Sequence, residues 1–204
     1  MTAARACEAL GHSVFEVTPP EVDMEAAGDA FFALGGAMVS NALDYFRSTF
    51  REAFGEDKLE SYTKALANRG RLADEASLAG FSQTLRHMAH DLDAAISDYD
   101  VLLCPTVAFP AFELGKFTGD RDIEELNAFV VSLARYTFPA SVAGWPAMSV
   151  PLFWSEDGLP IGSHFAAGHG RDDVLFSLAF ELEDARPWQP RLKQLMDELD
   201  GAAP

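Results

Sequence analysis

The chain has 204 residues, and its 15 lysines and arginines stand against 32 aspartates and glutamates, a formal net charge of −17. Hydrophobic residues make up 49% of the chain and charged residues 23%, a balance that excludes wholesale disorder and allows a sizeable core. The negative charge argues against a nucleic-acid partner and against an anionic membrane surface, because binding either one needs cationic side chains. No apolar run approaches the ~20 residues of a membrane span.

The first residues predict a helix followed by a strand. Alanine and leucine at helical spacing indicate a helix over residues 2–10, with Gly11 as its C-terminal stop. Ser13–Val17 is predicted as a short strand that Pro19-Pro20 closes. The first residues also lack the long apolar run of a signal peptide. A chain that opens in this way resembles the middle of an α/β unit, which suggests truncation.

The next part of the chain is predicted to be helical. Apolar residues recur at helical spacing over three stretches, 22–50, 56–68 and 74–98. The first stretch contains Gly35-Gly36, so it is either two helices or one bent helix. Asp74 and Glu75 mark the start of the last one, since negative charge suits a helix N-terminus.

Strands dominate the third part. Val101–Cys104 is a continuous apolar run that ends at Pro105, as expected of a buried strand. Ala147–Phe153 and Pro160–Ala167 are predicted as a hairpin around the turn Ser155–Gly158. Further helices are predicted at 123–134, 172–186 and 191–199. The length suits one domain or one and a half, which we divide into 1–20, 21–98, 99–190 and 191–204.

A search for a nucleophile finds no convincing catalytic set. No serine lies in a Gly-x-Ser-x-Gly or Gly-Ser-Ser-Gly turn, in which glycines would expose the hydroxyl. Ser163 comes nearest, but it lies in mid-strand without a second glycine, so we favour strand packing. The four lysines, Lys58, Lys64, Lys116 and Lys193, lie in polar surroundings that favour solvation. Cys104 has no histidine near it in the sequence, so we expect a buried, inert thiol.

Metal and phosphate sites are not expected either. His87 and His90 are three residues apart on a predicted helix, but the His-Glu-x-x-His pattern is absent. His164 and His169 flank a strand end and carry no stronger signal. The glycine pairs lack Walker or dinucleotide-binding spacing, so we predict no cofactor. Two cysteines, Cys7 and Cys104, are too few for a disulfide framework, which favours a reducing, cytoplasmic setting.

The stretch from Asp98 to Trp188 nevertheless resembles the C-terminal part of amidase signature enzymes, and within them the bacterial amidases of the 6-aminohexanoate cyclic-dimer hydrolase type. The upstream Ala9–Val14 is similar to the strand that follows the family's catalytic core. Four blocks occur in the family's order and spacing: Asp100–Thr106, Thr137–Pro151, Gly158–Gly162, and Asp172–Glu183 closed by Ala185–Trp188.

The resemblance implies an α/β fold, a mixed sheet flanked by helices, and an amide C–N hydrolase with a Ser–cis-Ser–Lys triad, an acyl-enzyme and no metal. The triad belongs to the family's N-terminal half, so the resemblance makes the whole chain, 1–204, a C-terminal portion without catalytic residues. It also implies a substrate-binding wall made of Cys104, Pro105, Thr106, Thr137, Pro139, Ser141 and Gly144. Ser141 stands where the family commonly has Asn, and a hydroxyl replaces only one amide hydrogen bond.

Two functions stay open at this point. The first is a portion of an amidase that acts on a small-molecule amide once the catalytic half is supplied. The second is a non-catalytic binding or assembly protein that retains the scaffold. Removing half of the fold should expose apolar surface, so we expect a homodimer or a complementing half as partner.

Overall fold

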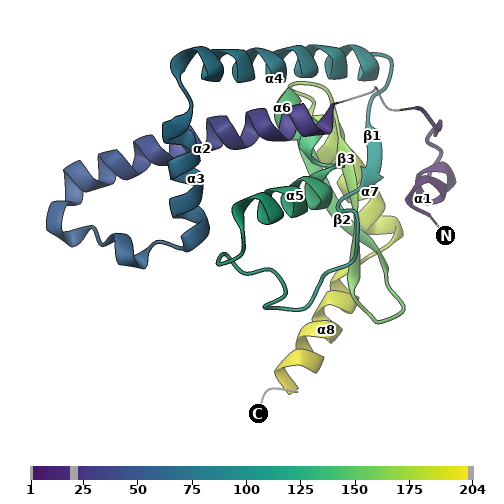
Figure 1. Ribbon diagram of the computed structural model, residues 1–204. Coiled ribbons are helices and arrows are strands. Elements are labelled where there is room, and N and C mark those ends of the chain that lie inside the picture. Colours follow the sequence, from purple (N-terminus) through teal and green to yellow (C-terminus); the bar gives the residue numbers. More distant parts are fainter. Residues whose placement is uncertain (1, 19–22, 202–204) are drawn as a thin grey trace.

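A computed structural model describes residues 2–18 and 23–201, and it confirms the expected α/β class (Figure 1). In chain order the helices are α1 (Ala3–Ala9), α2 (Met24–Phe50), α3 (Ser61–Leu72), α4 (Glu75–Ile96), α5 (Ile123–Ala134), α6 (Phe138–Ala143), α7 (Asp172–Ala185) and α8 (Gln189–Gly201). The strands are β1 (Leu102–Pro105), β2 (Ala147–Trp154) and β3 (Pro160–Ala166). Within the described residues, no helix has the length and apolar character that a membrane span requires.

Most predicted elements are present, and the differences have physical causes. The stretch 22–50, whose residue 22 lies outside the described residues, contains the single helix α2, which continues through Gly35-Gly36 and packs Gly36 against α3. Ser13–Val17 is not a strand, since nothing in the described residues pairs with it. The stretch 56–68 begins with a 3-10 turn, Glu56–Lys58, before α3 starts at Ser61.

The three described strands form a sheet in the order β1-β3-β2, with β3 in the centre. Both pairs are antiparallel, so this part of the expected mixed sheet contains no parallel pair. The turn between β2 and β3 is too short for a crossover, and a tight hairpin imposes antiparallel pairing. Gly158, at φ 79°, supplies the left-handed residue of that turn. Pro151 accompanies a register irregularity in β2, an edge strand in which a missing N–H is tolerated.

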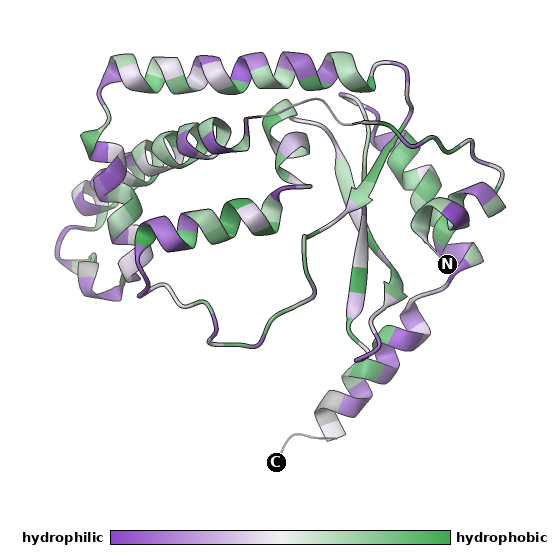
Figure 2. Cartoon of the chain, turned by 45° about the vertical axis from the view of Figure 1, so that its right-hand side comes forward, coloured by the Kyte–Doolittle hydropathy of each residue, from purple (hydrophilic) through white to green (hydrophobic). Residues whose placement is uncertain are grey.

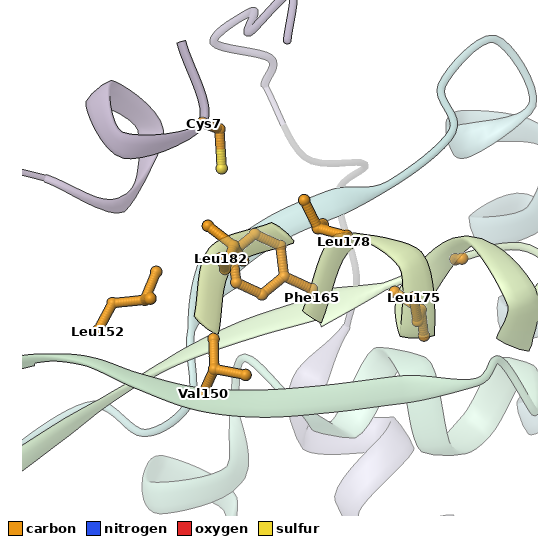
Figure 3. Close-up of a cluster of buried hydrophobic side chains, with 8 residues drawn as sticks. Cys7, Val150, Leu152, Phe165, Leu175, Leu178 and Leu182 are labelled. Carbon is orange, nitrogen blue, oxygen red and sulfur yellow. The ribbon is translucent and has the colours of Figure 1, made fainter. Parts of the chain in front are cut away.

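One face of the sheet carries the larger core. Val150 and Phe165 project from the strands toward Leu178 and Leu182 of α7, and Cys7 of α1 closes the cluster (Figure 3). Phe165 and Leu182 are the largest fully buried side chains of the described residues. The chain therefore forms its main core where α7 covers the sheet.

The other face packs against α4 and α6. Ala166 of β3 lies among Leu92 of α4 and Ala140 of α6, and Trp145 is buried beside them. The Trp145 indole N–H donates to Asp93 Oδ1 of α4 over 2.6 Å, which ties α4 to the segment that leads into β2. Asp74 caps α4 by accepting from the Ser77 N–H, as predicted. Along α4, hydrophobic and hydrophilic residues alternate by turns, in keeping with one face on the core (Figure 2).

Helices α2 and α3 cross at two glycines. A Cβ on Gly36 would lie 2.6 Å from the Leu66 carbonyl oxygen, and a Cβ on Gly70 would overlap the Gly36 backbone. Arg69 of α3 then pairs with Asp29 of α2, at 3.1 Å, and with Glu124 of α5, at 2.8 Å. The close approach of the two backbones therefore holds the helical region together.

We predict that Gly36→Ala destabilises the protein by about 2 kcal/mol, because backbone atoms of α3 cannot move away from the added methyl group as a flexible side chain could. Gly35→Ala is the matched control, since nothing lies within 4 Å of a Cβ at Gly35. Its better helix propensity should stabilise the protein by up to ~1 kcal/mol. Urea unfolding followed by circular dichroism measures both changes, and equal effects of the two substitutions would contradict the crossing.

Candidate functional site

A row of polar side chains crosses one face of the sheet near the end of β1. Cys104 of β1 pairs in register with His164 of β3, which pairs in turn with Ser149 of β2. Directly opposed residues in a sheet point to the same face, so the three side chains share one surface. Thr106 follows at the end of β1 and lies on that face, with its hydroxyl 2.7 Å from the Ser149 hydroxyl.

Gly162 creates the space for this hydroxyl pair. A Cβ at Gly162 would lie 2.5 Å from Thr106 Oγ1 and 2.6 Å from Ser149 Oγ. The Gly162 carbonyl also accepts the Thr106 N–H over 3.3 Å, which continues the β1–β3 pairing past the end of the strand. The absence of a Cβ at Gly162 leaves room for the Thr106 and Ser149 hydroxyls, which explains why the Gly158–Gly162 block ends in glycine.

Cys104 and His164 are brought together by strand pairing although they are 60 residues apart. Cys104 Sγ lies 3.4 Å from His164 Nδ1 and 3.6 Å from the Tyr136 carbonyl oxygen. Burial raises the pKa of the Cys104 thiol to about 11 and lowers the pKa of His164. Both groups are therefore neutral near pH 7, whereas a catalytic Cys–His pair needs a thiolate.

This geometry corrects one sequence expectation and supports another. Cys104 does have a histidine beside it, which sequence distance concealed, and its thiol is half-buried rather than buried. The neutral pair is nevertheless consistent with the expected inert thiol. Cys7 is buried in the main core.

The segment that contains Thr137, Pro139, Ser141 and Gly144 forms the short helix α6, not a kinked loop. Pro139 lies in the first turn, where no helical N–H is lost. The Ser141 N–H donates to the Thr137 carbonyl over 3.3 Å. Gly144 ends the helix at φ 75°, in the left-handed region that favours glycine.

An apolar cavity of about 180 Å³ lies between α2, α5 and α6. Among the described residues that line it, Thr137 and Ser141 carry hydroxyls, which donate to the Ala134 and Thr137 carbonyls over 3.2 and 3.5 Å. The other lining residues are Met24, Gly28, Phe31, Phe32, Val130, Val131, Ala134 and Phe138. Such a surface suits an uncharged ligand with one or two polar atoms. Sequence reasoning missed the α2 and α5 residues, because helical spacing identifies an apolar face without showing which partner it meets.

The seven residues of the expected substrate-binding wall thus divide into three groups. Thr137 and Ser141 line the cavity. Cys104 and Thr106 belong to the polar row on the sheet. The Cys104 thiol also contacts the carbonyl of Tyr136, the residue before Thr137. The remaining three, Pro105, Pro139 and Gly144, shape the backbone at element ends.

The other candidates separate in the structure. Ser163 is buried on the opposite face of β3 from His164, between Pro105 and Val150, which fits strand packing. His87 and His90 are exposed on α4. His169 lies 3.5 Å from Asp93, whereas His164 lies beside Cys104, so these two histidines have different partners. In residues 2–18 and 23–201, no three His, Cys, Asp or Glu side chains gather as a metal site.

The four lysines also have separate environments. Lys58, Lys116 and Lys193 are exposed, as expected of solvated side chains. Lys64 is half-buried instead, in a second cavity between α2 and α3.

Comparison with known proteins assigns the class. The family described as Amidase matches residues 1–176, and the chain belongs to this family. It is 34% identical over 188 residues to AmiC of Mycobacterium leprae, covering 92% of this chain and 40% of that protein. It is 30% identical to 6-aminohexanoate-cyclic-dimer hydrolase of Paenarthrobacter ureafaciens over 207 residues, covering 96% of this chain and 41% of that protein.

Solved structures agree. The structure of 6-aminohexanoate cyclic dimer hydrolase superimposes with a TM-score of 0.81 at 27% identity, covering 91% of this chain and 40% of that one. A bacterial aryl acylamidase of the amidase signature family superimposes with a TM-score of 0.73 at 18% identity, which supports the fold alone. The chain thus spans about 40% of the length of these relatives.

A thiol-reactivity experiment tests the neutral Cys–His pair. In Cys7→Ala, which leaves Cys104 as the single thiol, we expect alkylation by iodoacetamide near neutral pH to be roughly two orders of magnitude slower than that of free cysteine. The cause is the raised pKa of Cys104, about 11. The same variant unfolded in urea should react at the rate of free cysteine, and a fast reaction of the folded protein would show that a thiolate is present.

Proposed function

We propose that the chain forms one wall of the substrate pocket of an amidase, in which a Ser–cis-Ser–Lys triad supplied by the rest of the fold cleaves an amide C–N bond. The observation that carries the proposal is the match to about 40% of each relative's length. Neither nucleophile candidate is activated in the described residues, since Ser163 is buried and Cys104, although it lies beside His164, is protonated. The chain alone is therefore proposed to be inactive.

In this proposal the apolar cavity receives part of an uncharged amide substrate. Thr137 and Ser141 are the polar residues on a lining that is otherwise apolar, and their hydroxyls donate to the Ala134 and Thr137 carbonyls. A hydroxyl that donates in this way can still accept from an amide N–H, while the surrounding phenylalanine, valine and methionine side chains favour an acyl chain or a ring. The cavity thus supports a neutral aliphatic or aryl amide over a charged one.

The proposed partner is the remaining portion of an amidase fold. Phe176 and Phe180 of α7 are 66% and 67% exposed, on the side of that helix that does not face the sheet. Met38 and Tyr45, which are seven residues apart and so share a face of α2, form a second exposed apolar row. Relatives that are more than twice as long contain enough further chain to cover both rows. One further relative is by name a component of glutamyl-tRNA(Gln) amidotransferase, an enzyme built from more than one chain.

An activity assay tests the missing triad. We expect the purified chain to hydrolyse none of a panel of aliphatic and aryl amides, and a fluorophosphonate to label no serine, because such labels need a nucleophile activated by a base. A full-length amidase assayed in parallel controls for the reagents. Turnover that depends on Ser163, lost in Ser163→Ala, would contradict the proposal, and so would labelling at Ser163.

A second experiment tests the exposed α7 face. In the isolated chain, which lacks that remaining portion, we expect a second copy to cover the α7 face instead. The double variant Phe176→Ser, Phe180→Ser should therefore shift the chain from oligomer to monomer in size-exclusion chromatography with light scattering, because it removes about 200 Å² of aromatic surface. Leu114→Ser is the matched control, since Leu114 is fully exposed in a loop away from both rows. A stable monomer of the unmodified chain would contradict a partner at this face.

A further inference from the structure

The second cavity, about 150 Å³ in volume, lies between α2 and α3 and is lined largely by cationic and amide side chains. Arg47 comes from α2, while Lys64, Asn68 and Arg71 come from α3, and Leu43 and Ala67 form an apolar floor. We call this set of residues the basic pocket. Its volume is well above the ~15 Å³ that one water requires, so a small polyatomic ligand fits.

The concentration of positive charge in the basic pocket is unexpected in this chain. Three of only 15 lysines and arginines converge here although the net charge is −17. Asp44 pairs with Arg47 at 2.6 Å and with Arg71 at 3.6 Å. No carboxylate within the described residues lies within ion-pair distance of Lys64. Asp44 thus faces the two arginines, whereas the positive charge of Lys64 would be offset by a bound anion.

The hydrogen-bonding groups of the basic pocket also suit an anion. The Asn68 side-chain oxygen accepts from Arg71 Nη1 over 3.0 Å, so the amide nitrogen of Asn68 is available as a donor. Arginine presents planar N–H pairs that match oxyanions, and lysine adds a point charge. Donors therefore line the pocket from both helices.

The basic pocket is separate from the apolar cavity. Leu43 of the basic pocket lies eleven positions along α2 from Phe32, the nearest α2 residue of the apolar cavity, a distance of about 17 Å at ~1.5 Å per residue. The C-terminal half of α2 extends away from the sheet (Figure 1). A ligand in the basic pocket would therefore contact neither Thr137 nor Ser141.

We propose that the basic pocket binds a small tetrahedral oxyanion, either free phosphate or the phosphate group of a monoester. The bound anion would bridge Arg47 of α2 to Lys64 and Arg71 of α3, and thereby strengthen the packing of the two helices beyond their glycine crossing. Anything that binds the folded state alone raises its stability. An anion bound in the basic pocket would thus stabilise the helical region, a role that is separate from amide recognition.

Titration with inorganic phosphate at constant ionic strength, with chloride as the reference salt, tests the proposal. We expect phosphate to raise the melting temperature of the chain, and isothermal calorimetry to give a dissociation constant that Lys64→Met weakens about tenfold, the loss of one charge-assisted hydrogen bond. Lys193→Met is the matched control, because Lys193 is an exposed lysine on α8, outside the pocket. Phenyl phosphate in a parallel titration distinguishes a monoester from free phosphate by which of the two binds more tightly.

The substitution Asp44→Asn is expected to change the phosphate affinity in the opposite direction to Lys64→Met. Removing the carboxylate that pairs with Arg47 and Arg71 should tighten phosphate binding, an outcome that simple damage to the fold would not produce. Equal melting shifts in phosphate and chloride would overturn the proposal. So would equal phosphate affinities of the Lys64→Met and Lys193→Met variants. These readouts do not involve amide hydrolysis, so they are independent of the proposed amidase function.

Discussion

The burial of strand β3 on both faces is the constraint on which the rest of the structure depends. Phe165 is 1% exposed toward α7, while the next residue, Ala166, is 0% exposed toward α4 and α6. Successive strand residues point to opposite faces, so one side receives a large aromatic ring and the other only a methyl group. The helices on the alanine side can therefore approach closely, which brings Trp145 within hydrogen-bond distance of Asp93.

The same alternation produces the polar row. Two residues before Ala166, His164 points to the side of α6, where Cys104 and Ser149 flank it. The apolar surroundings keep this group of side chains uncharged, because burial disfavours the thiolate and the imidazolium alike.

The helical region is organised by a different principle, the contact of backbones at Gly36 and Gly70. Around that crossing, α2 and α3 also carry charged contacts, the Arg69 pairs and the basic pocket, beside the buried Leu43 and Ala67. The chain therefore combines a neutral cavity near the sheet with a cationic one at its periphery. We assign the first to amide recognition and the second to anion binding, and the two are far enough apart to be tested separately.

The sequence by itself determined the amidase family, the α/β class and most helices and strands, because hydrophobic periodicity and the blocks around Thr106, Ser141 and Gly162 are local signals. It also shows that the chain contains no glycine-rich serine turn, since such turns are local as well. Only the tertiary structure decided that Cys104 meets His164, that Gly28 and Val131 face Thr137 across one cavity, and that Lys64 joins two arginines. Those pairings depend on strand register and helix crossing, which place residues far apart in the chain within contact distance, and no local pattern in the sequence encodes that proximity.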